Sequence, residues 1–227
     1  MNRRQLTGSF EVGDVVGLLF ERWQQEPRIP AFFRDALRDR GPAAIADLGV
    51  RVGVPWDASL LEPILNLIER TSTKRGPRPW DDEVTINRGL AYLDRNYMKW
   101  RDTGPVAPRL SAAVRRFSPT PKPGDMYGWA DMIALTHDSA MIPMLRGYLT
   151  DSSVDRFTSV SSNMPSGVTP MRYSELAANA ICRLLGEPIM FSPWQRAAAP
   201  SGGPYPEWAE WDQKIAVLQQ RLDTLRR

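Results

Sequence analysis

Apolar residues recur at intervals of three and four along most of the chain, which is the spacing of one face of an α-helix. In residues 10–25 these positions are Val12, Val16, Leu19 and Trp23. The same spacing predicts helices that are separated by turns rich in proline and glycine, at residues 10–25, 30–40, 42–49, 57–71, 81–101, 107–117, 126–136, 139–150, 170–185 and 207–226. We find no convincing pair of strand patterns, so the sequence predicts an all-α protein.

The helix at residues 170–185 has the clearest signals at both ends. Thr169 is a favourable N-cap, and Pro170 at the first helical position has no amide hydrogen that needs a partner. Gly186 suits the left-handed conformation that often ends a helix, and Pro188 prevents the helix from continuing. We therefore expect a helix that is bounded by these residues.

The last helix carries apolar side chains spaced alternately by three and four residues, as in a coiled coil. This seam consists of Trp208, Trp211, Ile215, Leu218 and Leu222. We predict that residues 206–227 form an amphipathic helix that packs on the end of the preceding helices. The alternative is that the same seam binds a partner helix.

Two proline-rich segments, near residues 72–80 and 118–124, interrupt the helical pattern because proline is poorly tolerated inside a helix. We predict one helical-repeat domain over residues 1–205, with breaks at these two segments. The C-terminal helix at 206–227 follows it.

The stretch from Ile133 to Asp151 resembles the first helix of a HEAT-type repeat, in which a proline lies within an apolar helix and an aspartate follows it. Pro143 and Asp151 occupy those places. The stretch from Met171 to Gly186 resembles the second helix, and Arg172 stands where the family often has a basic residue. The chain departs from the pattern at residues 152–168, which replace the usual tight turn.

The resemblance to HEAT and armadillo proteins implies an irregular α-solenoid of stacked antiparallel helix pairs. A helix pair of this kind buries its apolar surface only against neighbouring pairs, and the resulting stack offers an extended binding surface. The resemblance therefore favours a non-enzymatic scaffold that mediates protein–protein interaction, with a protein or peptide as its partner.

The composition argues against most catalytic chemistries. The chain has one histidine, His137, and one cysteine, Cys182, whereas zinc sites and His-dependent triads need further groups beside them. Glycine-rich phosphate-binding motifs are also missing from the sequence. We therefore predict no catalytic residue, metal or cofactor, and a buried, unreactive Cys182. The alternative is an all-α hydrolase or lyase that uses Asp131 and Asp138 around His137, although Asp138 also suits a helix N-cap.

Positive charge is concentrated between Arg70 and Lys122. This segment contains twelve cationic and five acidic residues, whereas the whole chain has a net charge of only +3. Trp80, Tyr97 and Trp100 are interleaved with them, and this combination suits phosphate contacts and base stacking. The candidate residues for such a nucleic-acid or partner surface are Arg75, Arg78, Arg95, Lys99, Arg109, Arg115 and Arg116. A HEAT-like DNA-binding or DNA-repair protein is thus the alternative function, and a solvated charged face is the simpler explanation.

The single cysteine cannot form an internal disulfide, and the first residues lack the uncharged apolar run of a signal peptide. The chain also lacks the roughly 18 consecutive apolar residues that a membrane-spanning helix needs. We expect a cytoplasmic protein without a membrane span. A secreted or periplasmic protein whose signal peptide has been removed is the alternative.

Overall fold

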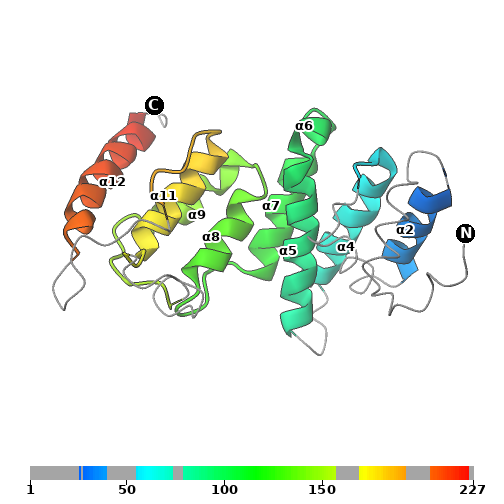
Figure 1. Cartoon of the computed structure of the whole chain (residues 1–227), viewed down its shortest axis with the longest axis horizontal. Coiled ribbons are helices and arrows are strands. Elements are labelled where there is room, and N and C mark those ends of the chain that lie inside the picture. Colours follow the sequence, from blue (N-terminus) through cyan, green and yellow to red (C-terminus); the bar gives the residue numbers. More distant parts are fainter. Residues whose placement is uncertain are drawn as a thin grey trace, which may run out of the picture. The chain divides into compact units, whose positions relative to one another are not determined.

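The computed structural model describes residues 26, 28–39, 55–73, 79–156, 169–192 and 205–224 (Figure 1). Within these ranges every regular element is a helix, and the β pairings are isolated bridges. The prediction of an all-α protein is therefore confirmed. The helices predicted at 10–25 and 42–49 lie outside the described residues.

The chain divides into two compact units, Met1–Phe117 and Ser118–Arg227. The boundary falls at the start of the proline-rich segment 118–124, where the sequence predicts a break. The helical-repeat domain predicted over 1–205 thus spans both units.

The first unit is built around the helix that follows residue 60. Its described elements are α2 (Arg28–Asp39), η2 (Ala58–Leu60), α4 (Leu61–Thr73), α5 (Pro79–Arg95), α6 (Tyr97–Trp100) and α7 (Val106–Phe117). Helix α4 packs against α2, α5 and α7, and it buries Ile64, Leu65 and Ile68 completely. The continuous helix predicted at 81–101 is in fact two, because a turn at Asn96 separates α5 from α6.

The second unit is centred on the helix α11. Its described elements are α8 (Met126–Ala134), η3 (Ser139–Met141), α9 (Ile142–Arg146), α11 (Tyr173–Leu184) and α12 (Pro206–Thr224). Helix α11 packs against α8, α9 and α12. The helix predicted at 139–150 ends at Arg146, since residues 147–150 form turns.

The two ends of α11 differ in how well the sequence predicted them. The C-terminal prediction is confirmed: Gly186 has a φ of +74°, and the amide of Glu187 donates to the carbonyl of Cys182 at 2.8 Å. The N-cap prediction at Thr169 was wrong, because the helix begins at Tyr173. There the amide of Arg172 donates to Oε2 of Glu175 at 2.6 Å, which is one half of a capping box.

Helices α8 and α11 run in the same direction. The hydroxyl of Tyr173, at the start of α11, accepts a hydrogen bond from the amide of Gly124, which lies just before α8. Near the other ends, Arg183 of α11 pairs with Asp131 of α8. The HEAT resemblance pairs a different set of helices, those within residues 133–151 and 171–186, and α9 and α11 in these stretches pack against each other. No solenoid is recognised in the described part of the chain, so the irregular α-solenoid stays a prediction.

None of the helices that the structure describes is both long and apolar enough to cross a membrane.

Candidate functional site

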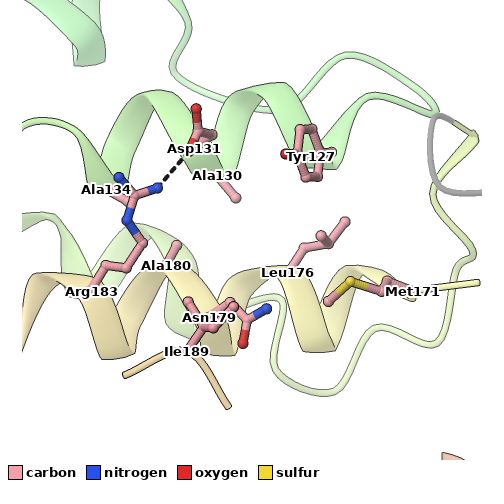
Figure 2. A pocket seen from close by; sticks show the side chains of 10 residues that line it. All are labelled: Tyr127, Ala130, Asp131, Ala134, Met171, Leu176, Asn179, Ala180, Arg183 and Ile189. Atoms are coloured by element: carbon pink, nitrogen blue, oxygen red, sulfur yellow. Dashed lines mark hydrogen bonds and ion pairs between the residues drawn. The ribbon is translucent and has the colours of Figure 1, made fainter. Parts of the chain in front are cut away.

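A groove of about 160 Å³ lies between α8 and α11 in the second unit (Figure 2). Its floor is formed by alanines from both helices, Ala130 and Ala134 of α8 and Ala180 of α11. Alanine has no side-chain atom beyond Cβ, so two facing helices that carry it leave space between them. Leu176 and Met171 extend the apolar lining toward the start of α11, as Figure 2 shows.

One rim of the groove is formed by a charged pair. Nη1 of Arg183 lies 2.5 Å from Oδ1 of Asp131, and the two side chains are 32% and 45% exposed. Tyr127 lies one helical turn before Asp131 on the same helix. Burial raises the pKa of the Tyr127 hydroxyl, and the Asp131 carboxylate raises it further. Tyr127 therefore stays neutral at physiological pH.

The opposite rim is held in place by Asn179. Its Oδ1 accepts hydrogen bonds from the amides of Met190 and Phe191, both at 2.9 Å, and its Nδ2 donates to the carbonyl of Phe191 at 2.7 Å. Phe191 is buried beside Trp211, and this leaves Ile189 at the rim with 51% of its surface exposed. The side-chain amide of Asn179 thus holds the backbone of residues 190–191 in place and keeps Ile189 exposed at the rim.

The start of α8, and with it Tyr127, is fixed by a buried carboxylate. Oδ2 of Asp155 accepts hydrogen bonds from the amides of Met126 at 2.8 Å and Tyr127 at 3.1 Å. A negative charge is favourable at a helix N-terminus because the first amides have no partner within the helix. Asp155 lies near the end of the described range 79–156, and no local pattern in the sequence marks it as a cap.

A second buried carboxylate, Glu175, joins α11 to α12. Glu175 is 0% exposed and accepts hydrogen bonds from Nε and Nη2 of Arg172 at 2.9 and 2.6 Å. Nη2 of Arg172 also lies 2.6 Å from Oδ1 of Asp212, and the guanidinium carbon is 5.1 Å from the ring centre of Trp208. These contacts tie the N-terminal end of α11 to α12.

The HEAT resemblance implies a role for Asp151 and Arg172 at the ends of a helix pair. In the structure, Oδ1 of Asp151 accepts the amide of Ser153 at 2.9 Å, and its carbonyl accepts the amide of Ser174 at 3.1 Å. Arg172 binds Glu175 and Asp212 instead. Asp151 therefore shapes the turn that follows α9, and its carbonyl binds the first turn of α11.

The predicted seam of the last helix packs within its own unit. Trp211, Ile215, Leu218 and Leu222 are buried. Trp208 is half-buried, and its Nε1 donates to the carbonyl of Pro170 at 3.1 Å. This placement agrees with the packing role, while the binding of a partner helix by this seam stays a prediction.

The structure brings together few of the predicted basic residues. Arg109 of α7 binds Glu62 and Glu69 of α4: its Nη1 lies 2.8 Å from Glu62 Oε1, and its Nε lies 2.8 Å from Glu69 Oε1. Nη2 of Arg116 donates to Ser72 at 3.3 Å. The other described candidates are exposed, and they are Arg95, Lys99 and Arg115. Arg75 and Arg78 lie outside the described residues.

The aromatic residues near these cations do not form a stacking platform in the described part of the chain. Trp100 is 1% exposed, and its Nε1 donates to the carbonyl of Leu93 at 2.6 Å. The ring of Tyr97 meets that of Trp100 edge-on, with 5.2 Å between the centroids. The side chain of Trp80 is not among those described.

The groups proposed for carboxylate chemistry serve separate structural purposes. Asp138 caps η3, since its Oδ1 accepts the amide of Ala140 at 3.0 Å, while Asp131 pairs with Arg183. His137 follows α8 in a left-handed conformation, with φ of +53°. Cys182 is buried, as predicted, and burial raises the pKa of its thiol, so it is a poor nucleophile. Within the described ranges, no three His, Cys, Asp or Glu side chains are grouped as metal ligands would be.

The Arg109 cluster predicts a pH dependence for the first unit. Hydrogen bonding to Arg109 holds the pKa of Glu69 below its ordinary value of 4.5. A carboxyl with a lower pKa in the folded state stabilises that state above its ordinary pKa, and this contribution is lost as the pH falls through the lowered value. We expect Arg109→Ala to reduce the free energy of unfolding by about 1–2 kcal/mol at pH 7, and by less once the pH has fallen below the lowered pKa of Glu69.

Urea denaturation followed by circular dichroism at several pH values measures this difference. Lys99→Ala, which removes an exposed cation from the same unit, is the matched control and should change stability by less than about 0.5 kcal/mol. An Arg109→Ala effect that does not become smaller as the pH is lowered from 7 through the acid range would contradict the assignment.

Comparison with protein-family models, curated proteins and solved structures finds no match for this chain. The relationship to HEAT proteins therefore stays a prediction that rests on residues 133–186.

The sequence patterns did not indicate several residues that line the groove, namely Tyr127, Ala130, Ala180, Arg183 and Ile189. The only available signal was the alanine content of the two helices, and alanine is equally common in ordinary helix packing.

Proposed function

We propose that this protein is a non-enzymatic, HEAT-like helical scaffold that mediates protein–protein interaction. In this proposal the α8–α11 groove binds a segment of the partner and takes up one apolar side chain of that segment. The observation that carries the proposal is the apolar, alanine-floored groove, whose volume is about 160 Å³. An apolar cavity of about 150 Å³ accommodates a benzene-sized group, so the groove fits a single phenylalanine or leucine side chain.

The residues at the rim also support binding. Ile189 and Tyr127 are 51% and 38% exposed, and both belong to the groove lining. Covering such surface on association is favourable, by roughly 25 cal/mol per Å² of apolar area. Interfaces commonly gain most of their affinity from a few anchor residues that fill pockets.

The two alternative functions receive less support from the described residues. A DNA-binding surface would use Arg109, which is already bound to two glutamates, and Trp100, which is buried. A carboxylate hydrolase or lyase would use Asp131 and Asp138, which have separate structural partners. We therefore favour the binding module.

Selection of a displayed random peptide library on the full chain tests this function. We expect enriched peptides that share an apolar anchor and bind with micromolar dissociation constants. Ile189→Glu places a charge at the groove rim and should weaken these peptides at least tenfold, because a buried apolar contact is replaced by an unpaired charge.

Val217→Glu is the matched control, since Val217 is 65% exposed on α12 and is not part of the groove. It should leave peptide affinity unchanged. The groove would be excluded as the binding site if the library yields no enriched peptide. It would also be excluded if the enriched peptides bind Ile189→Glu and Val217→Glu equally well.

A further inference from the structure

At the polar end of the α8–α11 groove, the carboxylate of Asp131 is only partly engaged by Arg183. Asp131 uses Oδ1 for Arg183, and within the described part of the chain no hydrogen bond reaches its Oδ2. The Asp131 side chain is 45% exposed, against 32% for Arg183. The carboxylate is therefore accessible to an incoming group.

The helix directions add negative potential at the same end. Because α8 and α11 run in the same direction, the C-terminal ends of both lie toward Asp131 and Arg183 (Figure 2). Each helix C-terminus is equivalent to roughly half a negative charge. Arg183 lies in the last turn of α11 and compensates part of this potential. Together, one carboxylate and two helix C-termini outweigh one guanidinium.

Tyr127 supplies an aromatic face beside the carboxylate. It precedes Asp131 by four residues on α8, so the two side chains share one face of that helix. Its ring is part of the groove lining and is 38% exposed. Aromatic faces attract ammonium and guanidinium groups. The apolar floor at Ala130 and Leu176 suits the methylene stem of such a side chain, which buries its carbon chain and keeps its charge at the rim.

We propose that the groove selects a partner segment in which a lysine or arginine lies next to the apolar anchor. The cationic head binds between Asp131 and Tyr127, while the anchor fills the space above the alanines. This inference rests on the proposed function, since it specifies the chemistry of the segment that the groove takes up.

Three small probes of one shape separate the two proposals: 2-phenylethanol, 2-phenylethylammonium and 3-phenylpropionate. Each is titrated against the full chain with ¹³C-labelled alanine methyl groups, so that shifts of Ala130, Ala134 and Ala180 report binding in the groove. We expect the ammonium to bind about fivefold more tightly than the alcohol, and the carboxylate more weakly than either.

Asp131→Asn should abolish the advantage of the ammonium over the alcohol. Asp223→Asn, which changes a 61% exposed carboxylate on α12, should leave the advantage intact. If the alcohol binds but the ammonium binds no more tightly, or if its advantage survives in Asp131→Asn, the charge preference is overturned while the groove function stands. If none of the probes shifts the alanine methyl groups, the groove function itself is overturned.

Discussion

Replacing Glu175 by alanine is expected to reduce the free energy of unfolding of the second unit by about 3–5 kcal/mol. Glu175 is 0% exposed and neutralises Arg172, which is itself only 7% exposed. Removing the carboxylate leaves a buried guanidinium with one remaining acidic partner, Asp212, at its outer edge. It also removes the acceptor for the Arg172 amide at the start of α11.

Two further variants show whether the cost comes from the uncompensated charge. Asp212→Asn changes the exposed end of the same cluster, where the carboxylate side chain is 61% exposed, and should cost at most about 1 kcal/mol. The double variant Arg172→Met with Glu175→Leu replaces the buried pair by apolar side chains and should recover much of the loss. Urea denaturation monitored by far-ultraviolet circular dichroism measures all three. A Glu175→Ala protein as stable as the parent would show that the cluster is not buried in solution.

Replacing Trp211 by alanine should have an effect of similar size, about 3–5 kcal/mol, because it creates a large cavity between α12 and the rest of its unit. Trp211 is 1% exposed, and its ring centre lies 5.4 Å from that of Phe191. Phe191 belongs to the segment that Asn179 holds at the groove rim. We therefore expect this variant also to weaken probe binding in the groove.

Val217→Ala is the control on the same helix. Val217 is 65% exposed, so this change should alter stability by less than about 0.5 kcal/mol. The comparison distinguishes the two roles of the seam. If the seam served a partner helix and not the core, Trp211→Ala would leave the stability of the isolated chain unchanged, and thermal denaturation would show no shift.

We expect Glu175→Ala and Trp211→Ala to affect groove binding as well as stability, because α11 packs against both α8 and α12. One side of α11 forms the groove with α8, and Arg172 and Glu175 tie its N-terminal end to α12. The shape of the groove thus depends in part on residues outside its lining, such as Arg172 and Glu175. Substitutions in this support should reduce stability and binding together, whereas Ile189→Glu should reduce binding alone.

Local patterns in the sequence were sufficient to predict helices and several of their ends. The three-and-four spacing of apolar residues identified α12, whose seam residues Trp211, Ile215, Leu218 and Leu222 are buried as the packing interpretation expects. Gly186 was correctly assigned to a left-handed helix end. Such features depend on residues within one or two turns of each other, so the sequence contains all the information they need.

The groove and its supports were decided by tertiary structure. Asp155 caps a helix that begins 29 positions before it, and Arg183 meets Asp131 across 52 positions. The N-terminus of α11 was misplaced for the same reason: Glu175 is stabilised as a cap by a buried arginine that also binds α12, 40 positions away. Within the described residues, the sequence by itself determined most of the helical segments and their apolar faces, because both depend on near neighbours. The direction in which α8 and α11 pass each other, and the space left between their alanines, depend on long-range packing that periodicity does not encode.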